Sequence, residues 1–132
     1  IISEQEVTMN FDESNHLPLF EQVAEQIEAA ILSGAFPELS QIPSTTEISK
    51  QFQINPATVL KGMNLLVDKQ IIEKKRGIGV FVKQGAKQII QEEKRTYFFT
   101  QEISQLVVEA KRLDISLAEL SAQIESGYQA WV

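Results

Sequence analysis

The sequence predicts a mainly α-helical protein with one small β-hairpin, and three observations support this fold class. Two helices with strong start signals follow one another after a short turn. Two β-rich runs around a glycine-containing tip come directly after the second of these helices. The last third of the chain returns to apolar residues at helical spacing. The length of 132 residues suits one ordinary domain, or a small domain with an appendage.

The first helix is predicted to begin at Pro18, because a ring with a fixed φ and no N–H suits the first turn. Apolar residues recur at helical spacing after it, and Gly34 is well placed to end the helix. The preceding residues 1–16 are polar and lack helical periodicity, so we expect a flexible arm there. Residues 35–43 contain two prolines and are predicted to be a connection.

The next two helices each open on a capping signal. Residues 44–47 (STTE) form a capping box, in which the Ser44 side chain accepts from the N–H of Glu47 and the Glu47 carboxylate accepts in return. Asn55 is a strong N-cap, and Pro56 takes the first helical position of a helix expected to end near Lys69. Two helices joined in this way form a helix-turn-helix.

A hairpin is predicted next, because residues 71–76 and 80–83 flank the turn residues Gly77, Ile78 and Gly79. A helix-turn-helix followed at once by a two-stranded hairpin is a winged helix. We therefore expect a winged-helix domain over residues 17–83.

Residues 84–132 are predicted to form a long helix, a tight turn at Asp114 and a shorter helix that ends near Gly127. A capping box, residues 116–119 (SLAE), marks the start of the shorter helix. Two helices cannot enclose a core of their own, so we expect a dimerisation tail. The predicted interface residues are Phe99, Ile103, Leu106, Ala110, Leu113, Leu117 and Leu120. The aromatic residues Phe98, Phe99, Tyr128 and Trp131 favour the same interface, and a small-ligand pocket is the alternative.

The net charge of −6 argues at first sight against nucleic acid, because neutralisation of phosphates supplies most non-specific affinity. The charge is unevenly distributed, however. Residues 1–40 hold eight acidic and no basic residues, whereas residues 41–83 hold seven basic and three acidic ones. A solvated surface accounts for this pattern when charge is considered alone. The basic central segment is also compatible with a DNA-binding unit.

Other functional classes have little support in the sequence. The absence of cysteine excludes disulfides and thiolate metal sites. The single histidine, His16, lies in the expected arm, and there is no phosphate-binding glycine loop. No run is apolar enough to span a bilayer, and no secretory leader precedes the first helix. We therefore expect a cytoplasmic protein without enzymatic activity, catalytic residues, metal, cofactor or membrane association.

Four segments in the order of the chain resemble the GntR family of bacterial transcription regulators. They are residues 18–22 (PLFEQ), 42–44 (IPS), 55–59 (NPATV) and 76–82 (RGIGVFV). The resemblance covers residues 17–83, and the short two-helix tail is similar to the YtrA-like branch. It implies a homodimer that binds an inverted-repeat operator on double-stranded DNA, most simply as a repressor. The identity of any small-molecule effector stays open.

The resemblance also implies which residues contact DNA. In this family the start of the recognition helix enters the major groove, and the wing contacts the minor groove or its backbone. The implied contacts are Asn55, Pro56, Ala57, Thr58, Lys61 and Asn64 on the helix, Arg76, Gly77 and Ile78 at the wing, and Ser44, Thr45 and Thr46 against phosphate. Considered without the resemblance, Ser44 and Asn55 are first of all helix caps.

Four positions depart from the family pattern. Thr46 and Leu60 stand where many relatives have arginine, and Gln53 and Gln70 replace turn glycines. Fewer arginines weaken phosphate and guanine contacts. The alternative function is therefore a winged-helix protein-interaction module that does not bind DNA.

Overall fold

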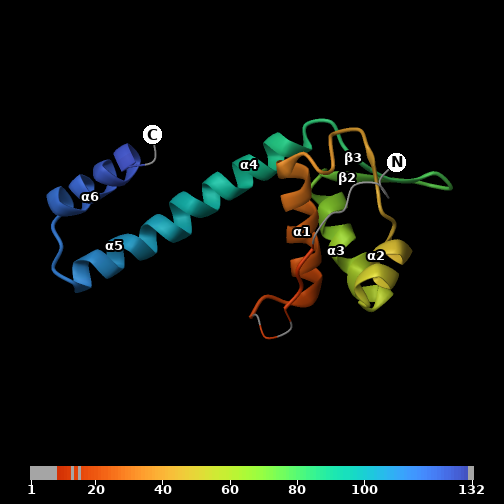
Figure 1. Ribbon diagram of the computed structural model, residues 1–132, viewed down its shortest axis with the longest axis horizontal. Coiled ribbons are helices and arrows are strands. Elements are labelled where there is room, and N and C mark those ends of the chain that lie inside the picture. The colour runs from red at the N-terminus through yellow and green to blue at the C-terminus, as the bar shows by residue number, and fades with distance from the viewer. Residues whose placement is uncertain (1–8, 13, 15, 131–132) are drawn as a thin grey trace. The chain divides into compact units, whose positions relative to one another are not determined.

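The computed structural model describes residues 9–12, 14 and 16–130, and the chain divides into two compact units at Glu92 and Glu93 (Figure 1). The order of elements confirms the predicted fold class, a mainly helical chain with a small antiparallel sheet. The elements of the first unit are α1 (Leu19–Ser33), β1 (Gln41–Ile42), α2 (Thr45–Phe52), α3 (Pro56–Asp68), β2 (Ile72–Lys75), β3 (Gly79–Val82) and the start of α4 (Ala86–Tyr97).

Both predicted caps of the helix-turn-helix are present. Ser44 Oγ accepts from the Glu47 N–H, and the Glu47 carboxylate accepts from the Ser44 N–H, each at 3.1 Å. Asn55 Oδ1 accepts from the Ala57 N–H at 2.8 Å, and Pro56 opens α3. Because each cap joins residues only two or three apart, the sequence alone was sufficient to predict where α2 and α3 begin.

The sheet has one strand more than the sequence predicted. Its antiparallel order is β1–β3–β2, with Ile42 opposite Val80 on one side of β3 and Lys74 opposite Val80 on the other. We had predicted residues 35–43 to be a connection. A two-residue strand that pairs only with a distant partner gives no alternating pattern from which it could be recognised.

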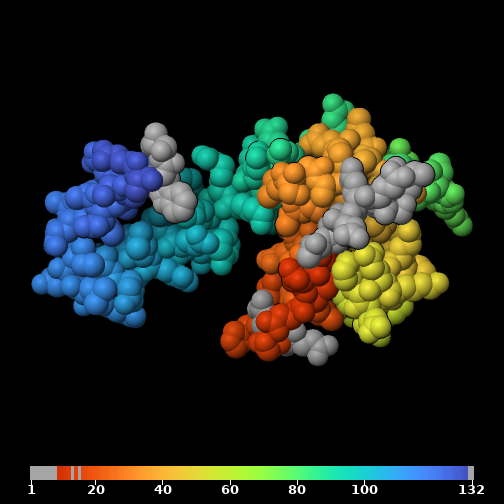
Figure 2. Space-filling model, viewed as in Figure 1, coloured from red at the N-terminus to blue at the C-terminus, as the bar shows by residue number. Residues whose placement is uncertain are grey.

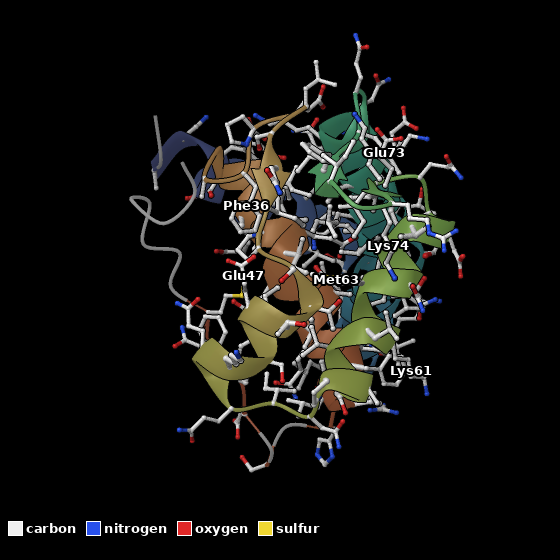
Figure 3. The ribbon with its side chains drawn as sticks, turned by 90° about the vertical axis from the view of Figure 1, so that its right-hand side faces the viewer. Phe36, Glu47, Lys61, Met63, Glu73 and Lys74 are labelled. Carbon is white, nitrogen blue, oxygen red and sulfur yellow. The ribbon has the colours of Figure 1, made fainter. Side chains whose placement is uncertain are left out.

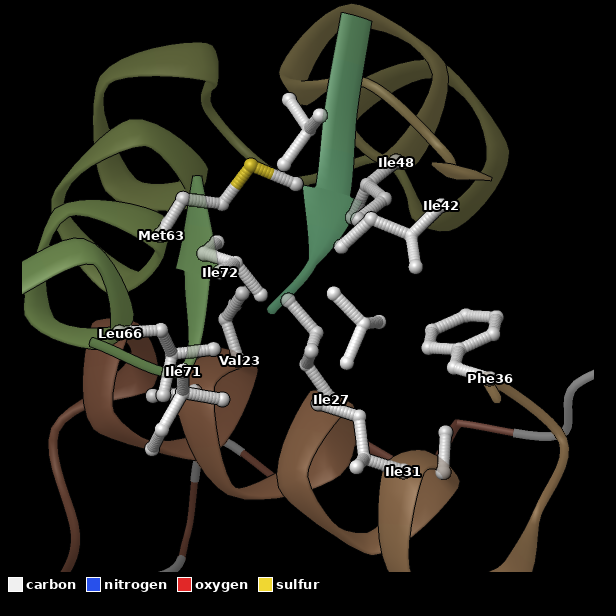
Figure 4. Close-up of a cluster of buried hydrophobic side chains, with 14 of the residues drawn as sticks. Val23, Ile27, Ile31, Phe36, Ile42, Ile48, Met63, Leu66, Ile71 and Ile72 are labelled. Atoms are coloured by element: carbon white, nitrogen blue, oxygen red, sulfur yellow. The ribbon is translucent and has the colours of Figure 1, made fainter. Parts of the chain in front are cut away.

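A single hydrophobic core holds the first unit together (Figure 4). Helix α1 contributes Val23, Ile27 and Ile31, which meet residues from α2, α3 and the sheet in the same cluster. The other fully buried large side chains in it are Phe36, Ile42, Ile48, Val59, Met63, Leu66, Ile71, Ile72, Val82 and Ile90. This core fixes α3 and the hairpin on one framework.

The described part of segment 1–16 packs on this core. Met9 is buried within it, and the Phe11 and Phe52 rings lie edge to face with centroids 5.3 Å apart. The Gln22 side chain donates to Asp12 O at 2.8 Å and accepts from the Asp12 N–H at 2.9 Å. Residues 9–12 therefore pack on the first unit and do not form the expected flexible arm. Residues 1–8 lie outside the described residues.

Two turn residues adopt the left-handed backbone that favours glycine. Gln53, between α2 and α3, has φ 55°, and Gln70, before β2, has φ 66°. These are the two positions where the sequence carries glutamine instead of the family's usual turn glycine. A non-glycine residue in this region is strained, because Cβ approaches the following carbonyl oxygen.

Replacing Gln53 by glycine is therefore expected to raise the free energy of unfolding by about 1 kcal/mol. The matched control is Gln51→Gly, because Gln51 is exposed within α2 and glycine there should cost about 0.5–1 kcal/mol. Urea unfolding of the two variants measures both changes. A loss of stability in Gln53→Gly would contradict the expectation.

Helix α4 starts in the first unit and is capped by a distant carboxylate. Ala86 and Ile90 are fully buried in the core. Glu38, from the loop after α1, accepts from the N–H groups of Gly85 and Lys87 at 3.0 Å each. The hydrogen bond from Gly85, followed by that from Lys87, lowers the pKa of the Glu38 carboxyl. The first unit therefore extends past the predicted boundary at residue 83.

The second unit consists of the end of α4, a π-helical segment η2 (Phe98–Glu102), α5 (Ile103–Arg112) and α6 (Leu117–Ala130). Asp114 makes the turn with φ 57°, and the predicted capping box between Ser116 and Glu119 opens α6. Helix α6 continues past Gly127. None of the helices in the described part of the chain has both the length and the apolar character needed to cross a bilayer.

Candidate nucleic-acid interface

Helix α3 has one buried side and one exposed side. Val59, Met63 and Leu66 are buried, whereas Ala57 and Asn64 are exposed. Residues three and four apart share a helix face, so the exposed side is continuous from the start of α3. Figure 3 looks onto this part of the unit and shows Lys61 on α3 and Lys74 on β2.

The start of α2 presents one exposed threonine beside two side chains engaged within the unit. Ser44 Oγ caps the helix, as described above. Thr45 Oγ1 donates to Met63 Sδ at 3.2 Å, which ties α2 to α3. Thr46 is exposed. Of the three residues predicted against phosphate, Thr46 therefore has the side chain most accessible to a ligand.

Lys61 is exposed, but its ammonium group lies over an aromatic ring of α1. Lys61 Nζ is 4.0 Å from the centroid of the Phe20 ring. Such an interaction stabilises an exposed cation by about 0.5–1 kcal/mol. This contact was not predicted from the sequence, because Phe20 lies on a different helix. Thr58 is half-buried, whereas Asn55 and Pro56 are exposed at the helix start.

Asn64 is joined to the hairpin. Lys74 Nζ donates to Asn64 Oδ1 at 2.7 Å. This contact between Lys74 and Asn64 was not predicted from the sequence. The sequence contains no signal for this contact, because it depends on the position of β2 beside α3.

The tip of the wing carries the three predicted residues Arg76, Gly77 and Ile78, all exposed. Gly77 has φ 77°, which suits glycine, and Ile78 is 66% exposed. Gln41 Nε2, from β1, donates to Ile78 O at 3.2 Å and so supports the tip. In Figure 2 the hairpin tip, drawn in green, projects from the surface of the first unit.

The predicted interface residues of the tail differ in exposure. Phe99, Leu106, Leu113 and Leu117 are exposed, the last at 80%, and Ile103 and Leu120 are half-buried. Ala110 is only 7% exposed. Trp131 lies outside the described residues, whereas Tyr128 is 78% exposed.

The helix-turn-helix, the three-stranded sheet and the projecting hairpin define the first unit as a winged helix-turn-helix domain. Residues 19–82 match the model of "Bacterial regulatory proteins, gntR family". Residues 19–82 therefore form a GntR-family helix-turn-helix domain, and that family consists of transcription regulators rather than enzymes.

Similar proteins extend the match beyond the winged helix. The chain is 28% identical over 126 residues to the HTH-type transcriptional repressor YtrA of Bacillus subtilis, covering 90% of this chain and 96% of that protein. A GntR-family regulator structure from Bacteroides thetaiotaomicron superposes with a TM-score of 0.74 at 29% identity, covering 87% of this chain and all of that one. The DNA-binding domain of AraR, solved with operator ORE1, has a TM-score of 0.50 at 28% identity, covering 57% and 92%.

Proposed function

We propose that this protein is a repressor of transcription that binds an inverted-repeat operator as a homodimer. The observation that carries the proposal is the continuous exposed side of α3 beside a projecting, basic hairpin. An α-helix fits the major groove of B-DNA, and a hairpin at its side can reach the adjacent backbone or minor groove.

The named relatives support the regulatory part of the proposal. YtrA, which matches this chain over nearly its whole length, is named a transcriptional repressor. The AraR domain, which matches the winged-helix part, was solved bound to an operator.

The charge distribution supports binding to phosphate. The basic side chains Lys74, Lys75 and Arg76 are exposed on the hairpin. Lys50, near the end of α2, is exposed as well. When such residues neutralise phosphates, counterions condensed on the DNA are released. We therefore expect the affinity for DNA to fall steeply as salt rises, despite the net charge of −6.

The second unit supports dimerisation. Its exposed large apolar side chains, beyond those already predicted, include Tyr97, Val107, Val108 and Ile124. A unit of two helices that leaves so much apolar surface open gains stability when a second copy covers it. Two-fold symmetry in the protein would be matched by an inverted repeat in the operator.

Each predicted DNA-contacting residue receives a role in this proposal. Thr46 and the start of α2, with Ser44 and Thr45, lie against phosphate. Asn55, Pro56, Ala57, Thr58, Lys61 and Asn64 enter the major groove. Arg76, Gly77 and Ile78 contact the minor groove or its backbone.

Selection of bound duplexes from a random DNA pool tests the proposal. The wild-type chain is expected to enrich one inverted repeat. The logarithm of its affinity for that repeat should fall linearly with the logarithm of the salt concentration. If no sequence is enriched and random duplex is not bound either, the winged helix acts as a protein-interaction module instead.

Arg76→Ala is expected to weaken specific and random duplexes by similar factors. Arg76 is exposed at the tip of the hairpin, where a guanidinium neutralises phosphate without reading bases. The slope of log affinity against log salt should flatten by about one per subunit. Fluorescence anisotropy with two duplexes over a range of salt measures both effects. A loss confined to the specific duplex would reassign Arg76 to base recognition.

A further inference from the structure

The hydrogen bond between Lys74 and Asn64 determines what the recognition helix can offer a base. Lys74 Nζ lies 2.7 Å from Asn64 Oδ1. An ammonium group carries only donors. The amide atom that faces Lys74 is therefore the oxygen, and the Asn64 NH2 group lies at the other end of the amide, where it can donate to another partner.

Together the two exposed side chains form a group that is rich in donors. Asn64 retains both N–H donors of its amide, and Lys74 retains two of the three on its ammonium. A second donor that approached Asn64 Oδ1 would meet the positive charge of Lys74 beside it. A partner with acceptors is therefore favoured over a partner with a donor.

The four base pairs differ in this property in the major groove. Guanine presents two acceptors, N7 and O6, whereas adenine presents the acceptor N7 beside the N6 amino donor. An asparagine on its own pairs with adenine through both amide atoms, and this pairing requires the oxygen to accept from N6.

We propose that Lys74 and Asn64 act as one donor pair that selects guanine, and that Lys74 is the positioning residue that prevents Asn64 from pairing with adenine. The proposal rests on the function proposed above, since it requires α3 to lie in the major groove. It assigns a role in base selection to a residue of the wing, which is otherwise expected to contact the backbone or the minor groove.

The adjacent lysine provides a matched control. Lys75 Nζ lies 3.7 Å from Glu73 Oε1 and 4.7 Å from the centroid of the Phe81 ring. It is exposed on the same strand and carries the same charge as Lys74. Lys75→Ala therefore removes one positive charge from β2 without removing the donor to Asn64.

The test is selection from a random duplex pool with the full-length wild type, Lys74→Ala, Lys75→Ala and Asn64→Ala. The wild type should enrich guanine at one position of each half-site, and Asn64→Ala should lose the preference there. Lys74→Ala should change the preferred base at that position from guanine to adenine. Lys75→Ala should keep guanine while binding all duplexes more weakly.

Competition between two duplexes that differ only at that base pair gives the magnitude. The wild type should prefer guanine by about tenfold, and Lys74→Ala should reverse the preference. An adenine in the wild-type motif, an unchanged preference in Lys74→Ala, or the same change in Lys75→Ala would each overturn the inference while leaving the proposed function intact. If the wild type enriches no motif, the proposed function fails and this inference falls with it.

Discussion

Leu106→Asp is expected to convert the dimer into a monomer and to weaken operator binding by at least about 100-fold. Leu106 is 39% exposed on α5, among the apolar residues that we assign to the interface. An unpaired carboxylate in an apolar contact costs several kcal/mol. The affinity of a dimer for two linked half-sites exceeds the affinity of one subunit for one half-site by about 10²–10⁴-fold without any new contact. A monomer loses this gain. Sedimentation velocity and anisotropy measure the two effects.

The control for Leu106→Asp is Gln105→Asp, which introduces the same charge at an adjacent exposed position of α5. It should leave both the dimer and the affinity nearly unchanged. A chain that ends at Glu92 should also be monomeric. It must extend that far, because Ala86 and Ile90 belong to the core of the first unit. A dimer in either Leu106→Asp or the shortened chain would contradict the assignment of the interface to the tail.

Gly62→Val is expected to destabilise the winged helix by about 3 kcal/mol or more. Helix α1 lies close to α3 at Gly62, where an added Cβ would lie 2.6 Å from Phe20 O and 3.0 Å from Val23 Cβ. The first of these atoms belongs to the backbone of α1, so the two helices must move apart. For a unit of this size the melting temperature should fall by about 10 °C or more.

Gly127→Val is the matched control, because Gly127 is also helical and an added Cβ there meets no atom within 4 Å. Its effect should stay below about 0.5 kcal/mol, since valine and glycine differ little in helix propensity. Differential scanning calorimetry of both variants makes the comparison. Equal losses of stability in Gly62→Val and Gly127→Val would contradict the claim that close packing at Gly62 excludes a larger side chain.

The parts of the fold that the sequence predicted are those encoded by local signals. The capping box of Ser44 and Glu47, the Asn55 cap and the turn at Gly77 each involve residues close together in the chain. Gln53 and Gln70, which replace turn glycines of the family, adopt the left-handed backbone that a turn glycine favours.

The parts that the sequence did not predict depend on contacts between distant residues. Strand β1 forms only because Gln41 and Ile42 find Phe81 and Val80 on β3. The π-helical segment η2 interrupts a helix whose apolar spacing gave no sign of it. A single inserted turn of this kind leaves the composition unchanged and moves the following side chains around the helix axis.

In the candidate site, too, local features were predicted from the sequence and contacts between distant residues were not. The sequence predicted which residues of α3 are exposed, because Val59 and Met63 mark the buried side. It did not predict which of the exposed side chains are already engaged. Lys61 lies over Phe20, which belongs to α1 and stands 41 residues earlier in the chain. Asn64 accepts a hydrogen bond from Lys74 on β2.

The central claim, a dimer on an inverted repeat, is tested most directly by native mass spectrometry of the protein on a selected duplex. The account predicts two chains on one duplex that carries the whole repeat, and an affinity at least about 100-fold lower for a duplex with one half-site. One chain on the whole repeat, or equal affinity for the half-site, would contradict it.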